Sequence, residues 1–210
     1  MSKLIKPSMI LIFLLLMAAQ AHAGGIGLFL SGGEVDAEWD GDYTNIESEG
    51  THRDFGFTVD SNLNTEKLFN YRLELGRAEW EPGNFNNRGV EADIDGLVMN
   101  HDFGFGSMIA PSVRLWFGPE IRLTLLEGEL EGVNARDIDL FGYGFGGAVG
   151  VNFSLPGRLT LAAKTGFVMM RYLGDGPNWT GSTWQNSDYD VDEDLVYVGV
   201  SMFFRTRSTR

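Results

Sequence analysis

The sequence lacks cysteine altogether in its 210 residues. This absence excludes disulfide bonds, thiolate metal sites and a lipid-modified N-terminal cysteine, and it leaves nothing to crosslink in an oxidising compartment. By contrast, 28 glycines and 15 phenylalanines are an unusual pair of abundances. Together they favour sheet over helix, and the length fits one domain.

Basic residues are also scarce. Lysine and arginine total 16 against 29 acidic residues, which gives a formal charge of −13 at pH 7. Loss of Lys3 and Lys6 with a targeting segment would leave 14 basic residues and a charge of −15. Because charge of this sign repels phosphate backbones, we expect no nucleic-acid partner.

Long apolar runs are absent apart from one near the start, from Met9 to Met17. It follows two lysines and precedes the small-x-small sequence Ala21-His22-Ala23, which is the pattern of a secretory signal peptide. The alternative, an inner-membrane anchor, would need about 20 apolar residues. We therefore predict a cleaved signal peptide at residues 1–23, with cleavage near Ala23 and a mature chain from Gly24.

The clearest pattern lies near the end of the chain. Apolar residues recur there with period two, at Val196, Val198, Val200, Met202 and Phe204. The alternate positions are small or amphipathic: Tyr197, Gly199 and Ser201. A tilted strand of about ten residues with two unlike faces is what crosses a bilayer in a transmembrane β-barrel.

Seven earlier segments repeat this alternation. The eight expected strands are residues 26–39, 55–60, 69–76, 92–103, 113–125, 141–153, 159–169 and 195–204. Long and short connections alternate between them, and the long ones are residues 40–53, 81–91, 127–137 and 174–192. Outer-membrane barrels have an even strand number and this asymmetry. We therefore predict an all-β fold for residues 24–204: an eight-stranded antiparallel up-and-down transmembrane β-barrel with short periplasmic turns and long external loops.

Two of these strands need an irregularity. The first changes its apolar parity at Gly32-Gly33, and neither parity of the fourth stays apolar throughout. We expect a β-bulge at Gly32-Gly33 and another at Gly96, which would place Ile94 and Leu97 on the same face.

The composition of the face opposite the apolar one indicates whether the apolar face points to lipid outside the barrel or into its interior. In residues 141–153 it is almost wholly glycine, which suits the lumen of a narrow barrel better than a solvated sheet. The alternative is a soluble lipocalin-like barrel with its apolar face inward. Charged residues on the expected lumen face are Asp60, Arg72, Glu74, Arg114, Glu120, Arg122 and Lys164. Because both signs are present, we favour an internal ion-pair plug over a gate or narrow ion path.

Aromatic residues near strand ends fit interfacial girdles. On the loop side the expected members are Trp39, Tyr43, Trp80 and Tyr172. Other strand ends carry Phe55, Phe69, Phe103, Phe153 and Phe204.

These features resemble the small outer-membrane β-barrel proteins related to the OmpA transmembrane domain and to OmpX. The resemblance covers residues 24–204 and includes the segment Arg114-Leu-Trp-Phe-Gly-Pro-Glu-Ile-Arg122 and the closing alternation. It implies a Gram-negative cell envelope, with outer-membrane lipid and lipopolysaccharide around the barrel. It also implies a barrel-assembly machinery that reads the strand ending at Phe204 as an insertion signal. The chain departs from the family pattern in a short basic periplasmic tail, residues 205–210.

Candidate catalytic chemistry is sparse. His52 is expected in a loop and His101 near the periplasmic rim, and neither adjoins a serine motif suited to nucleophilic catalysis. Residues 142–147 match a G-x-G-x-x-G dinucleotide fingerprint, but a strand is expected to continue where such a site needs a helix. We expect no cofactor.

An acidic segment precedes the last strand, with aspartates two residues apart at Asp188, Asp190, Asp192 and Asp194. It is no EF-hand, because the central glycine and the final glutamate are missing. A solvated loop is one interpretation. A weak divalent-cation site facing an anionic lipopolysaccharide surface is the other hypothesis.

The function predicted is that of a non-enzymatic outer-membrane barrel, with a structural or surface-interaction role toward an external protein or surface ligand. A small-solute, porin-like pore is the alternative. A lipid A-modifying enzyme is the third.

Overall fold

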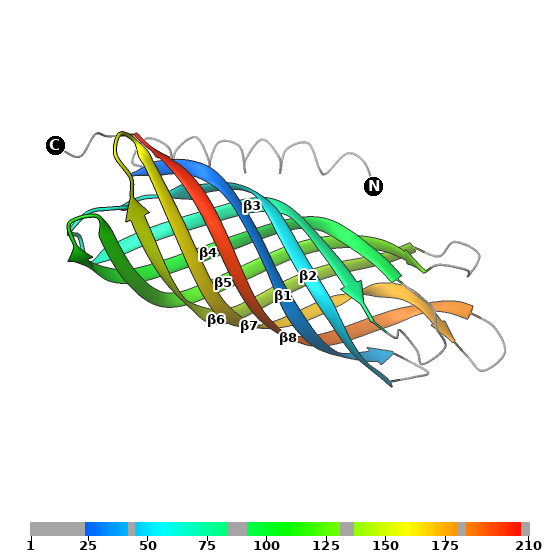
Figure 1. The fold of residues 1–210 in the computed structure, drawn as a ribbon. Coiled ribbons are helices and arrows are strands. Elements are labelled where there is room, and N and C mark those ends of the chain that lie inside the picture. The colour runs from blue at the N-terminus through cyan, green and yellow to red at the C-terminus, as the bar shows by residue number, and fades with distance from the viewer. Residues whose placement is uncertain (1–23, 42–44, 84–91, 131–136, 180–183, 207–210) are drawn as a thin grey trace.

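The computed structural model describes residues 24–41, 45–83, 92–130, 137–179 and 184–206. Eight strands form one closed antiparallel barrel, in which each strand pairs with the next and the last pairs with the first (Figure 1). They are β1 (Gly25–Gly41), β2 (Asn45–Asp60), β3 (Phe69–Pro82), β4 (Ala92–Ala110), β5 (Val113–Leu130), β6 (Asp137–Ser154), β7 (Leu159–Trp179) and β8 (Trp184–Arg205). The predicted eight-stranded up-and-down barrel is confirmed. The expected signal peptide and most of the expected tail lie outside the described residues.

The register of the sheet sets the tilt and height of the barrel. A path that starts at Gly25 and steps from each residue to its paired residue on the next strand goes once round the barrel and returns to β1 at Val35. The start and the end of the path are therefore ten residues apart on β1. A shear of ten over eight strands corresponds to a tilt of about 40°. At about 3.3 Å per residue, the 22 residues of β8 then span roughly 55 Å along the axis. Because a transmembrane barrel needs an apolar band only about 25 Å tall, the strands continue well beyond it.

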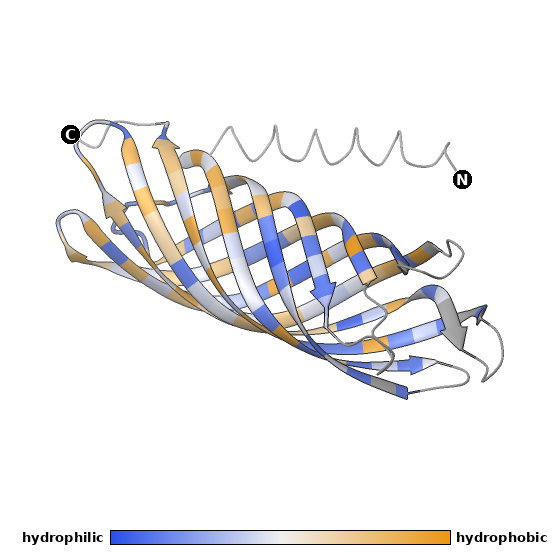
Figure 2. Cartoon of the chain, turned by 45° about the vertical axis from the view of Figure 1, so that its right-hand side comes forward, coloured by the Kyte–Doolittle hydropathy of each residue, from blue (hydrophilic) through white to orange (hydrophobic). Residues whose placement is uncertain are grey.

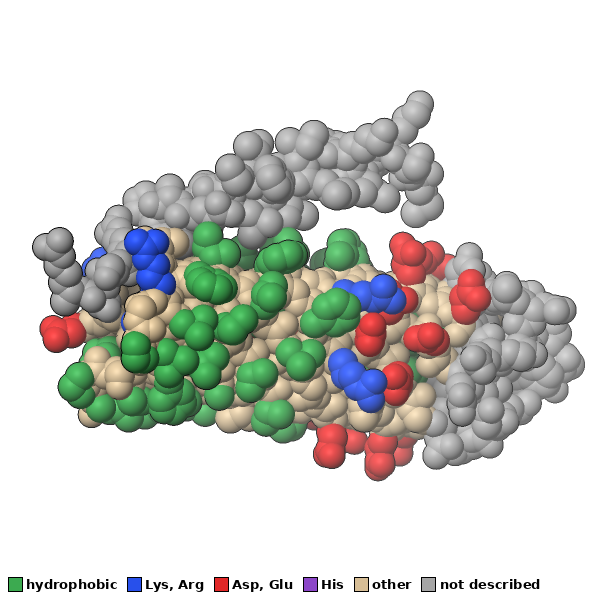
Figure 3. Space-filling view, turned by 45° about the horizontal axis from the view of Figure 1, so that its top comes forward, with side chains coloured by type: hydrophobic (Ala, Val, Ile, Leu, Met, Phe, Trp, Pro, Cys, Tyr) green, Lys and Arg blue, Asp and Glu red, His purple; other side chains and the backbone are tan. Residues whose placement is uncertain are grey.

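The outer surface accordingly divides into two zones. The lipid band is the apolar zone next to the short turns, and its exposed side chains include Leu28, Phe57, Phe117, Val198 and Phe204 (Figures 2 and 3). The extension is the part of the strands beyond this band, where outward side chains are mostly acidic (Figure 3). Its carboxylates on β2, β1 and β8, called the acidic face below, are Glu34, Asp36, Glu38, Asp40, Glu47, Glu49, Asp188, Asp190, Asp192 and Asp194.

The side chains inside the barrel also change in character between the lipid band and the extension, but in the opposite direction to those outside. Inside the lipid band the buried side chains include many charged groups. Inside the extension they are mainly apolar and form one cluster around Trp39, Trp80 and Tyr172. No helix within the described residues is long and apolar enough to cross a membrane.

The expected bulge at Gly32-Gly33 is wrong. β1 stays in unbroken register with β2 and β8 through both glycines. Val35 and Trp39 are therefore buried inside the barrel, whereas Leu28 is exposed outside. The apolar parity changes because the strand leaves the lipid band, so the outer face meets water while the pleat continues.

The expected bulge at Gly96 is wrong for the same reason. β4 stays in register with β3 and β5 through this residue. Ile94 is buried inside the extension, and Leu97 is exposed on the other face. The register between β4 and β5 shifts between Met108 and Ala110 instead, next to the turn.

Segments expected as long loops are in large part strand. Residues 45–53 belong to β2, while residues 174–179 and 184–192 belong to β7 and β8. Their polar residues face water on the outside of the extension, so polarity alone did not distinguish strand from loop. Residues 40–41, 81–82, 127–130 and 137 also belong to strands, and residues 42–44, 84–91, 131–136 and 180–183 lie outside the described part of the chain.

The expected aromatic girdle at the loop side is wrong in three places. Trp39, Trp80 and Tyr172 are fully buried in the lumen of the extension, and Tyr43 lies outside the described residues. At the turn end, Phe69, Phe153 and Phe204 do point outward and are exposed, as a girdle there requires.

Glycines on the inner face make room for large neighbours, as predicted. A Cβ atom on Gly150 would lie 2.5 Å from the Trp116 ring, and one on Gly142 would lie 2.5 Å from the Tyr172 ring. Residues 142–147 are part of β6, so the G-x-G-x-x-G match is a strand feature. Strand β6 then turns into β7 through residues 155–158, where Gly157 adopts a φ of 83° that favours glycine.

Candidate functional site

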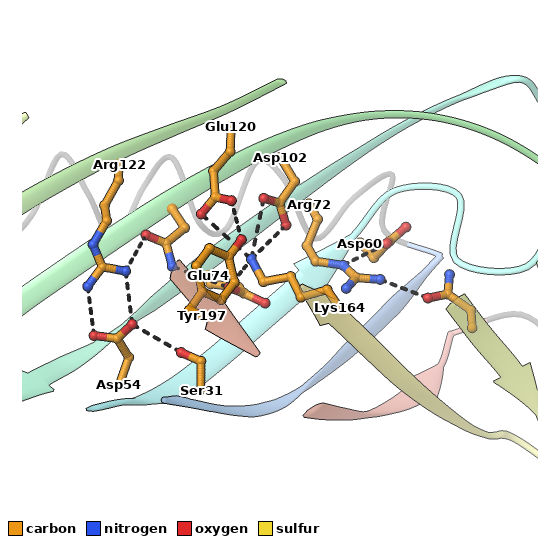
Figure 4. A network of polar contacts seen from close by, with 12 residues as sticks. Ser31, Asp54, Asp60, Arg72, Glu74, Asp102, Glu120, Arg122, Lys164 and Tyr197 are labelled. Atoms are coloured by element: carbon orange, nitrogen blue, oxygen red, sulfur yellow. Dashed lines mark hydrogen bonds and ion pairs between the residues drawn. The ribbon is translucent and has the colours of Figure 1, made fainter. Parts of the chain in front are cut away.

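Three layers of buried polar groups fill the lumen within the lipid band (Figure 4). In the layer nearest the extension, Arg122 donates hydrogen bonds to both carboxylate oxygens of Asp54, at 2.9 and 2.8 Å. It also donates to the Asn100 side-chain oxygen at 3.2 Å. The Ser31 hydroxyl donates to Asp54 at 3.0 Å, and His52 Nδ1 lies 3.2 Å from the same carboxylate. Arg122 therefore joins β5 to the opposite wall at β2.

Lys164 lies at the centre of the second layer. Its Nζ atom is 2.9 Å from Glu74, 3.1 Å from Asp102 and 3.8 Å from Glu120. The Tyr197 hydroxyl donates a hydrogen bond to Glu120. One ammonium group on β7 thus holds carboxylates from β3, β4 and β5 across the lumen, with all four charged side chains buried.

Arg72 forms the third layer. Its Nε donates to Asp60 at 3.1 Å, and Nη2 donates to the Asn152 side-chain oxygen at 3.0 Å. The guanidinium also lies between two aromatic rings, 4.9 Å from the Trp116 centroid and 5.0 Å from the Phe203 centroid. Charge, hydrogen bonds and ring contacts together stabilise this fully buried cation.

The turn end of the barrel is closed by the segment that connects β2 to β3. Arg114 donates to backbone carbonyls of this segment, at 2.8 Å to Lys67 and 3.2 Å to Leu68. Asn152 donates to the Leu63 carbonyl at 2.6 Å, and the Leu63 side chain is buried. Arg114 therefore holds a turn against the barrel, which differs from the expected role in an ion pair.

The extension is filled by aromatic stacking. The Trp39 and Trp80 ring centroids are 5.0 Å apart, and Trp80 and Tyr172 are 5.4 Å apart. Trp39 also donates to the Ser48 hydroxyl at 3.1 Å. Glu193 is buried in this region next to Tyr172, and burial raises the pKa of its carboxyl. The lumen of the extension is thus packed like a hydrophobic core.

The structure places all seven predicted lumen residues inside the barrel, where each is buried. It adds partners that the sequence interpretation missed, chiefly Asp54, Asp102 and Glu193. Asp54 and Glu193 lie in or next to segments assigned to loops, and Asp102 lies in the strand whose parity was misread. The signal that could have found them is the alternation itself, which continues through residues 184–195 with Tyr189, Val191, Glu193 and Leu195 inward.

The divalent-cation hypothesis at the four aspartates is not supported by their geometry. Asp188, Asp190, Asp192 and Asp194 lie on β8 and are exposed on its outer face. Alternate residues of a strand stand about 6.6 Å apart, so the four carboxylates form a row along β8 and do not converge on one point. Asp190 instead accepts a hydrogen bond from Arg171 at 3.1 Å. Within the described residues, no group of three or more acidic, His or Cys side chains could hold a metal ion.

Both histidines lie elsewhere than expected. His52 is on β2 and points into the lumen, where it is buried. His101 is on the middle of β4, away from the rim, and its Nδ1 lies 2.7 Å from the Tyr71 hydroxyl. The pair joins neighbouring strands β3 and β4 on the outer face of the lipid band.

The closing strand has the two faces that the alternation predicted. Val196, Val198, Val200, Met202 and Phe204 are all exposed on the outside. Arg205, expected in a separate tail, is the last residue of β8, and it donates to the Leu155 carbonyl at 2.9 Å. Recognition of this strand by an assembly machinery remains a prediction.

No protein-family model and no curated protein sequence matches the chain. Solved structures do match. OprG from Pseudomonas aeruginosa superimposes with a TM-score of 0.53 at 12% identity, over 89% of this chain and 98% of that one. Neisserial surface protein A gives 0.37 at 12% identity, over 82% and 96%. Ail of Yersinia pestis gives 0.32 at 10% identity, over 85% and 99%.

The chain has the fold of a small outer-membrane β-barrel. The likeness to OprG carries this statement, together with the closed eight-stranded sheet and the lipid band. None of the three matches is the OmpA transmembrane domain or OmpX, so that narrower resemblance stays a prediction.

Proposed function

We propose that the protein is a non-enzymatic outer-membrane barrel that acts through its external surface, with the extension outside the cell and the short turns in the periplasm. The single observation that carries the proposal is the filled lumen. Three layers of side chains join opposite walls inside the lipid band, and an aromatic core fills the extension. An eight-stranded barrel has room for its own side chains and little else.

The same closure argues against catalysis. The clustered carboxylates and arginines of the three layers, which could act as acids, bases or anion holders, are buried in the lumen. A lipid substrate approaches from the outer face or from the leaflet, so it would not meet these groups. The lumen charges are better explained as a plug, whose buried ions survive because they are paired or, like Arg114, hydrogen-bonded.

The acidic face is the surface we propose for external interaction. Glu38 lies in register with Glu47 on one side and Asp192 on the other, so like charges stand directly opposite one another. Each such pair costs about 0.2–1 kcal/mol relative to neutral neighbours. Arg171 lies 3.9 Å from Asp192, but within the described residues no ion pair joins Glu38 or Glu47 to a cation. A local rule left broken in this way is typical of a functional surface. The partner that fits is basic.

Planar-bilayer recording tests the closed lumen. We expect the wild-type barrel to conduct no more than protein-free bilayers, and Glu120→Gln and Arg122→Gln to behave in the same way. Channel steps from the wild type that change in size with either variant would favour the small-solute pore instead.

Binding of a basic probe tests the acidic face. Reconstituted barrel should bind polylysine at low salt, and the triple variant Asp36→Asn, Glu38→Gln, Asp192→Asn should bind it several-fold more weakly. The matched control removes three exposed outward carboxylates from β4, β5 and β6, by Asp93→Asn, Glu127→Gln and Asp139→Asn. Because Glu127 and Asp139 also lie opposite each other in register, this control has a like-charge pair as well and differs from the acidic face in position. Equal losses from the two triples would show unspecific attraction to net charge and would refute a defined surface.

A further inference from the structure

The lipid band carries a groove on its outer face. It has a volume of about 700 Å³ and runs from Leu115 on β5 across β6, β7, β8 and β1 to Arg53 on β2. Apart from Arg53 and Thr165, the outward side chains along it are apolar or glycine. The groove therefore joins an apolar trough to a single cation.

The groove exists because small side chains share one row of the sheet. Gly32, Val198, Thr165 and Val149 face one another in register across four neighbouring strands. A larger residue, Phe167, stands exposed beside this row. At Gly32 the nearest atom to an added Cβ would be 3.7 Å away, so the trough is open there.

The length and slope of the row match a lipid chain. From Val149 on β6 to Arg53 on β2 the row crosses four strand spacings, or about 19 Å at roughly 4.8 Å each. Because the strands tilt by about 40°, the row climbs about 12 Å along the barrel axis, toward the extension. One leaflet of the hydrocarbon core is about 15 Å deep. The row thus runs from mid-bilayer to the interface where head groups lie.

Arg53 lies at the upper end with little to neutralise it. Its Nη1 atom is 3.5 Å from Glu81, and both side chains are more than half exposed, at 60% and 59%. Such a pair holds its arginine weakly. Arg77, on the neighbouring strand, has two carboxylates instead, Asp95 at 3.1 Å and Glu79 at 3.5 Å. Arg53 is therefore the better placed of the two to bind a phosphate, which guanidinium does through paired hydrogen bonds.

We propose that this groove seats an acyl chain of a phosphate-bearing lipid of the external leaflet, with the phosphate on Arg53. Apolar contacts along the row position the acyl chain, and the positive charge of Arg53 at the end of the row selects a head group with a negative phosphate. The site lies wholly on the outer face of the lipid band, so it does not depend on the acidic face or on the closed lumen.

Native mass spectrometry from nanodiscs tests this lipid site. Nanodiscs containing equal amounts of dimyristoyl phosphatidylglycerol and dimyristoyl phosphatidylcholine offer the same chains with an anionic or a zwitterionic head group. We expect the wild-type barrel to retain the anionic lipid about fivefold over the other, and Arg53→Gln to bring the ratio close to one. Arg77→Gln is the control, and it should leave the ratio unchanged.

A second pair of variants tests the trough. Gly32→Phe should fill it and lower the total amount of retained lipid, whereas Gly147→Phe should not, although a Cβ on Gly147 is also open, with its nearest atom at 3.6 Å. Gel mobility with and without boiling confirms that each variant folds. Equal retention of the two lipids by the wild type would overturn the proposal. So would equal effects of the two arginine variants, or a spectrum in which a second copy of the chain replaces lipid.

Discussion

In β1, Leu28 points outward to lipid while Ser31 points inward to an ionic layer; further along the strand, Glu38 points outward to water while Ala37 points inward to an aromatic core. Lipid band and extension are built by the same strands in unbroken register. What differs is the medium outside. Where the surroundings change from lipid to water, the outer face of the sheet changes from apolar to polar and the inner face from polar to apolar. The strand needs no bulge for this change.

The two zones also differ in what holds their walls together. In the lipid band, water is excluded on the outside and charges pair within, whereas the extension is stabilised by burial of apolar side chains, as in a soluble protein. This contrast predicts that equivalent substitutions act differently in the two zones.

The largest effect is expected in the second ionic layer. Lys164→Met would leave Glu74, Asp102 and Glu120 buried together without their cation, and removing one partner of a buried pair costs about 3–5 kcal/mol. Urea titration, with the folded protein followed by its mobility on unboiled gels, measures the loss of stability. Arg77→Met, which breaks exposed pairs of the same kind, is the control and should shift the midpoint little. Equal shifts would show that the lumen layer is not a special source of stability.

The next effect separates the zones. Trp80→Ala removes the ring between Trp39 and Tyr172 and should destabilise the extension by about 3 kcal/mol. Because the lipid band does not depend on this stack, boiled and unboiled samples should still differ in gel mobility. Proteolysis, by contrast, should trim the extension of the variant. Phe145→Ala, a loss of an exposed aromatic ring in the lipid band, should leave the proteolysis pattern unchanged. Collapse of the whole barrel by Trp80→Ala would contradict independent stabilisation.

A glycine pair compares the two faces of a single strand. Gly150→Val would place a methyl-bearing Cβ against the Trp116 ring and should cost about 1–3 kcal/mol, as overpacking does. Gly147→Val points outward on the same strand, where its Cβ would make an ordinary van der Waals contact of 3.6 Å with the Gly118 carbonyl oxygen, and it should have little effect. The midpoints of urea unfolding for the two variants check this, and similar values would mean that the lumen is looser than described.

Much of this comparison could be predicted from the sequence, and its limits have a physical cause. The number of strands, the outward row ending at Phe204 and the lumen position of Arg72, Arg122 and Lys164 follow from alternation and charge. The inward position of Trp39 and the strand position of His52 did not follow. Both errors arose because one face was assumed to stay apolar along a whole strand, which holds only while the solvent outside stays the same.

Partners across the lumen were beyond sequence reasoning for another reason. Asp54 and Arg122 lie 68 residues apart, and their meeting depends on the shear of the barrel. Arg114 was expected in an ion pair because its charge and parity match those of Arg72. It binds turn carbonyls instead, since the segment after β2 folds under the end of the barrel.

A pH effect is expected in the extension. Burial raises the pKa of the Glu193 carboxyl above its ordinary value of 4.5, so the folded state holds this proton more tightly than the unfolded state. Its contribution to stability is present below about 4.5 and is lost as pH rises through the raised pKa. Glu193→Gln should therefore make the extension more resistant to proteolysis at neutral pH and flatten its pH dependence. A variant that is less stable at neutral pH would show that the carboxylate form is the one the fold uses.

The smallest effect is expected on the acidic face. Replacing Glu38 by Gln removes like-charge neighbours at Glu47 and Asp192, which should stabilise the extension by about 0.2–1 kcal/mol for each. Added salt should give the wild type a similar gain and the variant a smaller one, because salt screens the same repulsion. Proteolysis of the extension at two salt concentrations measures both. A variant with unchanged salt dependence would contradict the repulsion.

The exchange of faces is tested most directly by cysteine labelling, since the chain has no cysteine of its own. Single variants Leu28→Cys, Ala37→Cys and Glu38→Cys sample the lipid face, the core of the extension and its outer face on one strand. In liposomes with a water-soluble maleimide on both sides of the bilayer, only Glu38→Cys should react quickly, and Ala37→Cys should react only after unfolding. Rapid labelling of Ala37→Cys with protection of Glu38→Cys would mean that the lipid band continues along the strand and that the extension does not exist.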